Sequence, residues 1–430
     1  MPERRNIIMV TFDSLRADHC GFMGYSRNTT PTLDKLAKRG VYFKNAVASG
    51  VPTPVSMMGI FTGKYTDVDS TCVNPFVWRD ELKNRSTLAQ KLSKIGYFTG
   101  AIHENAYVSS FFGFNKGFNS YIDNPTELRA KSSFVLKLKY RLHEFMTLGL
   151  RRLGFTSEIS DVLLKMGTCS PWEVYYDLIL DWIEMVKKPF FLWILLLDTH
   201  TPYIPPRYYL DDTNSFEAYY YWLILGNACR SGSRISCDKI KKIIKIYDNC
   251  IRYADLFVKR LVKDTSDCDP VYIFHADHGD GFGEHGIYQH TKPHYLYEEL
   301  IHVPFLIYNV DTTPEKVIYP VSLVDMSGII FDIINGRDTI FDSAIRKKDD
   351  TFYAISRTVT GGAKKIAVRS YPWKLILGQG KGFELYNLKK DPYESENVFM
   401  DEQDVAKEFL EIVKIFRNTY LLKNVLGRIK

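Results

Sequence analysis

The sequence lacks any apolar run long enough to cross a membrane. A bilayer-spanning helix takes roughly 18 to 20 successive apolar residues, and no stretch of the 430 residues reaches that length. Near the N-terminus, the apolar run at residues 7–10 is too short for the apolar region of a secretion signal. These absences predict a cytoplasmic protein with reduced thiols.

Other absences narrow the class of protein further. The seven cysteines are odd in number and fit no zinc-site spacing. No internal repeat or low-complexity tract is present. The net charge is only +6, and no basic run is interleaved with aromatic residues as in a nucleic-acid-binding module. We therefore expect no nucleic-acid partner, and instead an anionic substrate or an anionic membrane surface.

What is present suits a folded enzyme. With 45% hydrophobic residues, the chain has enough apolar side chains for a large core. Strand and helix patterns alternate over residues 6–335, which predicts one doubly wound α/β domain. The tail instead reads as a small α+β subdomain. Its strand patterns lie at 351–358, 365–369, 373–377 and 383–388, and its helical pattern lies at 402–422.

The boundary between these two parts is placed in the polar stretch at residues 336–350. This division predicts a large α/β domain at residues 1–345 and a C-terminal subdomain at residues 346–430. The C-terminal subdomain is expected to contain an antiparallel sheet followed by a terminal helix.

The run at residues 271–286, VYIFHADHGDGFGEHG, is the most informative segment. Residues 271–275 form a strand pattern, and the glycines that follow at 279, 281 and 283 predict a tight turn. Asp277 and His278 therefore stand at the carboxyl end of a strand, where open α/β sheets bind their ligands. An acidic residue beside a histidine at this position predicts a metal site.

A second strand pattern, at residues 6–12, ends on Asp13. An aspartate after a strand often only caps the next helix. Together with Asp277 and His278, however, Asp13 is expected to complete the ligands of one cation. Oxygen ligands with a single imidazole suit manganese, zinc, magnesium or calcium better than copper or an iron–sulfur cluster.

These segments resemble the sulfatase-like branch of the alkaline phosphatase superfamily. The matching stretches are 11–18, 30–34, 40–46, 53–63, 198–206, 276–286, 296–304, 384–388 and 391–394. Their order and spacing span most of the chain. The resemblance implies an alkaline phosphatase/sulfatase-like doubly wound sheet with a small C-terminal subdomain, and hydrolysis of sulfuric or phosphoric esters.

The chain departs from the sulfatase pattern at the nucleophile. Thr53 occupies the position of the cysteine that sulfatases oxidise to formylglycine, and Met57 stands where an arginine is expected. Threonine cannot be matured to that aldehyde, and methionine offers no cation to hold the aldehyde hydrate. Threonine at this position resembles the phosphoethanolamine and phosphoglycerol transferases of the superfamily.

A threonine hydroxyl at a helix start beside a divalent cation can attack phosphorus directly. The cation favours ionisation of the hydroxyl, and helix-start amides stabilise charge on the ester oxygens. Thr53 is accordingly the predicted nucleophile, with Ser56 as the fallback. The alternative, that Thr53 caps the helix at about residues 54–61, is compatible with the same role.

The resemblance places further residues at the site. His200, after the apolar run 190–197, is predicted to hold the ester or protonate the leaving group. Asn105 is expected to donate a hydrogen bond to a non-bridging ester oxygen. His290, Lys292 and His294 precede a segment where the family binds substrate, and the spacing favours Lys292 or His294.

Ser14 and His278 bear on the choice of metal. Ser14 stands where sulfatases usually have a second metal-binding aspartate, and His278 stands where many have asparagine. One carboxylate fewer and one imidazole more moves the predicted site away from oxygen-only calcium ligation. Manganese or zinc is therefore favoured, with calcium or magnesium as alternatives.

Residues 134–155 combine apolar residues at helical spacing with surrounding lysines and arginines. This pattern predicts either a helix packed in the ordinary way, or a basic interfacial helix or lid in peripheral contact with a membrane.

Two functions remain open from the sequence. The first is a metal-dependent hydrolase of phosphate or sulfate esters that uses Thr53. The second is a transferase that passes a phospho-group to a sugar or glycan hydroxyl. The substrate in either case is an anionic ester.

Overall fold

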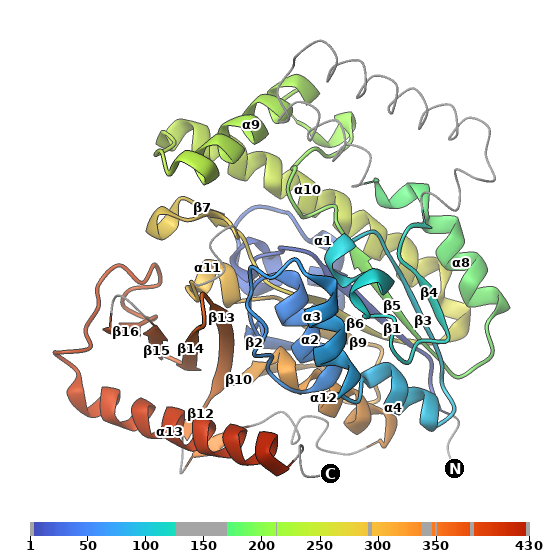
Figure 1. Ribbon diagram of the computed structural model, residues 1–430. Helices are drawn as coiled ribbons and strands as arrows, with labels where there is room; N and C mark the ends of the chain where they lie inside the picture. The colour runs from blue at the N-terminus through green and yellow to red at the C-terminus, as the bar shows by residue number, and fades with distance from the viewer. Residues whose placement is uncertain are drawn as a thin grey trace.

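The computed structural model describes residues 4–125, 170–211, 213–290, 295–336, 346–348, 351–378 and 382–426. A mixed sheet forms its centre, and helices lie on both faces of that sheet (Figure 1). In the described part of the chain this sheet has eight strands in the order β10-β2-β9-β6-β1-β5-β3-β4. The predicted doubly wound α/β class is confirmed.

The central strands are buried along their whole length and mostly apolar, because helices cover both faces of the sheet. β1 (Ile7–Phe12), β5 (Phe190–Leu196) and β6 (Val271–Ala276) are buried at every residue. β1 lies between β5 and β6 and runs parallel to both. The remaining strands of this sheet are β2 (Val41–Val47), β3 (Phe98–His103), β4 (Ser120–Ile122), β9 (Phe305–Tyr308) and β10 (Glu315–Ser322).

β9 is the exception to the parallel arrangement, since it pairs antiparallel with both β2 and β6. The sheet is therefore mixed, as large α/β sheets often are.

The helices around this sheet differ in how apolar they are. α10, the longest, is amphipathic and buries one stripe of side chains, whereas α2 is buried at every residue. The bounds are α1 Pro31–Ala37, α2 Thr53–Thr62, α3 Pro75–Lys83, α4 Leu88–Lys94, α8 Tyr176–Met185, α9 Ser215–Ser231, α10 Cys237–Asp264, α11 Glu298–Ile301 and α12 Met326–Ile334.

The C-terminal part contains an antiparallel sheet, β13-β14-β15-β16, and a long helix (Figure 1). The apolar side chains of this sheet and of α13, among them Ile355, Val368 and Phe409, form a second core cluster. The bounds are β11 Lys347–Lys348, β12 Thr351–Phe352, β13 Ala354–Thr360, β14 Ala363–Ser370, β15 Trp373–Gly378, β16 Gly382–Asn387 and α13 Gln403–Leu426.

These elements match the predicted tail, while the boundary at residues 345–346 stays a prediction. The segment 134–155, for which a basic helix was predicted, lies outside the described residues. Among the described helices, none is both long and apolar enough to span a bilayer.

Candidate active site

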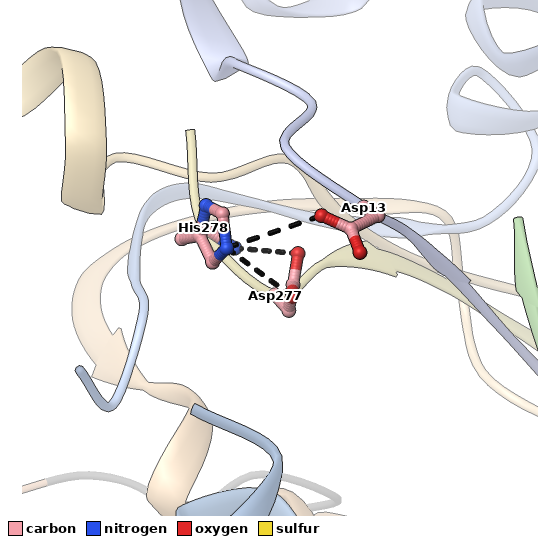
Figure 2. A group of neighbouring side chains, drawn as sticks. All are labelled: Asp13, Asp277 and His278. Atoms are coloured by element: carbon pink, nitrogen blue, oxygen red, sulfur yellow. Dashed lines mark hydrogen bonds and ion pairs between the residues drawn. The ribbon is translucent and has the colours of Figure 1, made fainter. Parts of the chain in front are cut away.

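Three buried side chains converge at the carboxyl ends of β1 and β6. One ligand-type atom from each of Asp13, Asp277 and His278 lies within 4.8 Å of the other two. His278 Nε2 is 3.5 Å from Asp277 Oδ2 and 3.9 Å from Asp13 Oδ1, and Figure 2 shows the ring facing both carboxylates. Residues more than 260 positions apart in the sequence thus form one cluster.

Strand pairing accounts for this convergence. β1 and β6 are parallel neighbours, with Phe12 opposite Ala276, so the next residue of each strand is an aspartate at the same sheet edge. Ser14 then adopts a left-handed backbone with φ of 65°, which few residues other than glycine and asparagine favour. In this conformation the Ser14 amide donates a hydrogen bond to Asp277 Oδ1 at 3.2 Å.

The chemistry of this cluster fits a divalent cation. Asp277 Oδ2 is buried and has no hydrogen-bond partner among the described residues. His278 Nδ1 donates to the Gly279 carbonyl at 2.8 Å, so the Nε2 lone pair is directed at the two carboxylates. In the described part of the chain neither carboxylate pairs with a lysine or arginine. Two buried carboxylates and an oriented imidazole are therefore available to one cation.

Burial and neighbouring charges act differently on the two aspartates. Burial, together with the adjacent Asp13 carboxylate, raises the pKa of Asp277 to about 6. Burial also raises the pKa of Asp13, but His200, His278 and His290 lower it, so its pKa falls below the usual value. Two carboxylates this close disfavour double ionisation unless a positive charge lies between them.

Thr53 brings a hydroxyl to the same cluster. Its Oγ1 lies 3.2 Å from His278 Nε2 and 3.4 Å from Asp13 Oδ2. Thr53 is the first residue of α2, Pro52 is the N-cap, and no side chain caps this helix. The hydroxyl therefore faces the two ligand candidates and does not cap α2.

The neighbours of Thr53 on α2 serve packing. Ser56 Oγ donates to the Asp277 backbone carbonyl at 2.7 Å, which ties α2 to the strand end. Met57 is fully buried in the main core and places no cation near the cluster. The fallback nucleophile Ser56 is thus engaged elsewhere.

Asn105 and Ser14 both contact the Asp13 carboxylate. Asn105 Nδ2 donates to Asp13 Oδ2 at 2.8 Å, while its Oδ1 accepts the Tyr107 amide at 2.9 Å. Ser14 Oγ donates to Asp13 Oδ1 at 3.0 Å. Asn105 therefore orients a candidate ligand, a contact that the sequence did not predict.

Two further histidines lie beside the cluster. The His290 ring is 4.6 Å from the His278 ring and 5.2 Å from the His200 ring, measured between centroids. His290 Nδ1 is 3.0 Å from Asp280 Oδ1, and Tyr203 donates its hydroxyl proton to the other oxygen of Asp280. His290 is thus held in place by a buried carboxylate.

The spacing argument favoured Lys292 or His294 over His290. Both of those residues lie outside the described residues. The sequence signal for His290 is the concentration of six of the ten histidines between residues 275 and 302. Other histidines of this run make contacts outside the cluster. His275 bonds Thr11 within the sheet, His285 stacks on Tyr297, and His302 contacts the Lys44 carbonyl.

The described residues thus form an α/β sheet of eight strands with a candidate metal cluster at its carboxyl edge. The Sulfatase family model matches residues 5–336. The chain belongs to the sulfatase family, as the resemblance predicted. Enzymes of this family are ester hydrolases that use a divalent metal.

Several named proteins and solved structures are similar to this chain. An arylsulfatase of Clostridium perfringens is 25% identical over 345 residues, covering 71% of this chain and 68% of that protein. Phosphoethanolamine transferase EptA of Helicobacter pylori is 30% identical over 91 residues, which are 20% of this chain and 17% of the transferase. The crystal structure of the phosphonate monoester hydrolase of Agrobacterium radiobacter is similar in fold, with a TM-score of 0.68, 16% identity, and coverage of 97% of this chain and 96% of that one.

Proposed function

We propose that this protein is a metal-dependent hydrolase of phosphate or sulfate esters that uses Thr53 as its nucleophile. The observation that carries the proposal is the position of Thr53 Oγ1, 3.2 Å from His278 Nε2 and 3.4 Å from Asp13 Oδ2. An alcohol is a weak nucleophile near neutral pH and needs such neighbours to ionise.

Asp13, Asp277 and His278 would hold the cation, and manganese or zinc suits this donor set best. When bound, such a cation supplies positive charge that favours the alkoxide and stabilises charge on the ester oxygens. Asn105 supports this set by fixing the Asp13 carboxylate. The Gly279 carbonyl holds the His278 tautomer.

The reaction then follows from the chain's own groups. Thr53 Oγ1 loses its proton to water and attacks the phosphorus or sulfur atom, and the bond to the leaving-group oxygen breaks. His200 donates a proton to that oxygen. His290, held by Asp280, contacts the anionic ester. Water then cleaves the Thr53 ester and restores the hydroxyl.

Phosphate esters are the preferred substrates on chemical grounds. Thr53 cannot be converted to formylglycine, and Met57 is buried in the core without a charge to offer. Ordinary formylglycine sulfatase chemistry is therefore unsuited to this site. Sulfate esters are the alternative substrates, since the similar protein of Clostridium perfringens is named an arylsulfatase.

The test is the intact mass of the protein after a rapid quench during turnover. Purified protein with manganese or zinc is mixed with aryl phosphate, phosphodiester, phosphonate or sulfate esters. We expect an adduct on Thr53 with the preferred substrate. Thr53→Ala should lose turnover by roughly four to six orders of magnitude, as removal of other catalytic nucleophiles does, while Thr53→Ser should retain part of it.

Thr71→Ala, at an exposed threonine in a turn, is the matched control and should keep full activity. Wild-type activity in Thr53→Ala, or an adduct mapped to another residue, would refute the mechanism. The same quench with each ester class decides between phosphate and sulfate.

A phospho-group transferase is the second candidate, and the partial match to a phosphoethanolamine transferase favours it. A transferase would form the same Thr53 adduct, but the phospho-group would then pass to a sugar or glycan hydroxyl instead of to water. Product analysis with and without an added glycan acceptor separates the two functions. A hydrolase releases the free anion at the same rate in both cases.

A further inference from the structure

A cavity of about 920 Å³ is lined by residues of the main sheet, of the loops at its carboxyl edge and of the C-terminal sheet. It opens between β10, the edge strand of the main sheet, its neighbour β2, and the C-terminal sheet, which stands next to these strands in Figure 1. Among the described residues that line it, none belongs to the set Asp13, Thr53, Asp277 and His278. Its volume is in the range of pockets that bind small organic molecules.

A bulge in β10 forms one wall of this cavity. Val317 pairs with Phe43 and Pro320 pairs with Asn45, so β10 has one residue more than β2 in this interval. Bulges redirect side chains and often lie next to functional sites. The two unpaired residues are Ile318, 60% exposed, and Tyr319, 39% exposed.

Asn45 and the C-terminal sheet complete this wall. Asn45 Nδ2 donates to the Ile318 carbonyl at 2.6 Å and so stabilises the bulge. Tyr319 packs against Phe352 with ring centroids 4.3 Å apart. Tyr371, at the end of β14, is 51% exposed and also lines the cavity. Two aromatic residues therefore offer ring surfaces to a bound molecule.

The charged residues that line the cavity differ in whether they are already paired with an opposite charge. The acidic residues all pair with basic side chains: Asp18 and Glu284 with Arg16, Glu298 with Arg369 and Lys374, and Glu299 with His285. Lys44 and Lys316, by contrast, have no carboxylate partner among the described residues. The four cations and four carboxylates of the described lining balance formally, and Lys44 and Lys316 are the two cations left without a carboxylate partner.

The cations also lie close enough to influence one another. Burial lowers the pKa of Lys44, and the charges of Lys316 and Arg369 lower it further. Arg369 is almost fully buried, and its Nε has no hydrogen-bond partner in the described part of the chain. A bound anion would relieve the repulsion among these three side chains.

We propose that this cavity binds a small organic anion with a planar ring. Its acidic group would lie beside Lys44 and Lys316, and its ring would pack against Tyr319 and Tyr371. A polymer or a metal ion fits less well, because the cavity is of small-molecule size and its carboxylates are already paired. This inference does not depend on the proposed hydrolase function.

The probe is naphthalene-1-sulfonate, whose carbon–sulfur bond is not an ester and cannot be hydrolysed. Isothermal titration calorimetry on the full chain should give one site per chain. Naphthalene-1-methanol, which has the same ring without charge, should bind at least roughly tenfold more weakly. Inorganic sulfate and naphthalene-1-phosphonate distinguish which acidic group the site prefers.

The decisive variants are Lys316→Gln and Tyr371→Ala, both at exposed positions, with Lys44→Gln as the third. Each should weaken binding of the sulfonate, by roughly tenfold for a lysine. Lys259→Gln, at an exposed lysine of α10, and Tyr208→Ala, at a tyrosine 74% exposed elsewhere, are matched controls that should bind normally.

Three results would overturn the proposal. The first is that the wild-type protein and the Lys44→Gln/Lys316→Gln double variant bind the sulfonate with equal affinity. The second is that the wild-type protein binds the sulfonate and the neutral alcohol with equal affinity. The third is that binding of the sulfonate is lost in His290→Ala but kept in the double variant, because the probe would then occupy the Thr53 cluster. Binding retained in His290→Ala and lost in the double variant supports the cavity.

Discussion

Thr53 and Met57 together restrict the chemistry open to this member of the sulfatase family. A hydroxyl at residue 53 can act as a nucleophile without any maturation step. The buried thioether of Met57 supplies no charge to the cluster. Thr53 Oγ1 contacts Asp13 and His278, two of the three residues proposed to hold the cation.

Asp277 should be required for metal binding. Asp277→Asn removes one charge and one of the two lone-pair-rich oxygens, while the Ser14 and His278 amides can still donate to the remaining oxygen. Mutating a residue that only hydrogen-bonds to a metal ligand already lowers metal affinity about 10- to 100-fold. For Asp277→Asn, which changes a proposed ligand, we expect Mn²⁺ or Zn²⁺ affinity to fall by at least about 100-fold, with loss of ester cleavage.

Equilibrium dialysis with elemental analysis measures this affinity. Asp267→Asn, at an exposed aspartate, is the control and should bind metal normally. Retention of both metal and activity in Asp277→Asn would remove Asp277 from the ligand set.

His103 should make the folded state sensitive to acid. It is fully buried against Tyr121 and Trp193, and neither ring nitrogen has a hydrogen-bond partner among the described residues. Burial lowers the pKa of His103 from 6.5 to about 4, against a smaller opposing effect of Asp123. Between these values the unfolded chain binds a proton and the folded chain does not.

Stability is therefore fully present above pH 6.5 and falls as the pH drops towards 4. The pKa difference of 2.5 units corresponds to about 3 kcal/mol of the free energy of unfolding. His103→Leu should reduce the loss between pH 7 and pH 4 by about that amount, as measured by urea denaturation. An unchanged pH dependence in the variant would contradict this role.

At the scale of elements, α2 depends on its close approach to the loop after β2. Ser49 Oγ donates to the Ser56 carbonyl at 2.9 Å, and Gly59 leaves room for the Ser49 side chain. A Cβ at residue 59 would lie 2.2 Å from Ser49 Oγ and 2.6 Å from Ser49 Cβ. Such distances require α2 or the loop to shift.

Gly59→Ala should consequently destabilise the protein by about 1–3 kcal/mol, as overpacking of a core does. Activity should also fall, because the shifted helix carries Thr53. Urea denaturation and the rate of ester cleavage are the two measurements.

Gly226→Ala in α9 is the matched control for this substitution. The nearest atom to its added methyl group is Arg230 Nη1 at 3.7 Å, so helix propensity should raise stability by up to about 1 kcal/mol. Equal effects of the two substitutions would show that α2 tolerates displacement.

At the scale of the whole molecule, a buried ion-pair network joins the C-terminal sheet to the main body. Lys374 of β15 is fully buried, and its Nζ lies 3.1 Å from Glu298 Oε1 and 2.8 Å from Glu394 Oε1. Glu298 belongs to α11 and also pairs with Arg369 at 2.8 Å. The charge of Lys374 thus balances carboxylates from both parts.

Lys374→Met should therefore destabilise the protein by about 3–5 kcal/mol, because it leaves the buried Glu394 carboxylate without its cation. Lys364→Met on β14 is the control. Lys364 pairs with Asp67 at 2.9 Å, but both side chains are about half exposed, so its loss should cost at most about 1 kcal/mol. Urea denaturation measures the free energy of unfolding of both variants. Similar losses in the two variants would contradict a structural role for the buried network.

The fold class, the family and the strands that end at the site could be predicted from the sequence. These strands are buried and mostly apolar, and Asp13 and Asp277 follow two of them directly. Because parallel neighbours present their carboxyl ends at one sheet edge, the order of residues alone indicates a shared site. The unusual Thr53 and Met57 are likewise visible in the sequence, since they are departures from a motif.

Only the tertiary structure decided which side chains face that site. It places His290 beside His278, directs Asn105 to the Asp13 carboxylate, and leaves His275 in the sheet. It also forms the cavity between strands β10 and β2 and the C-terminal sheet. Local sequence sets the period of strands and helices, but the direction of a side chain beyond a turn depends on contacts between segments far apart in the chain.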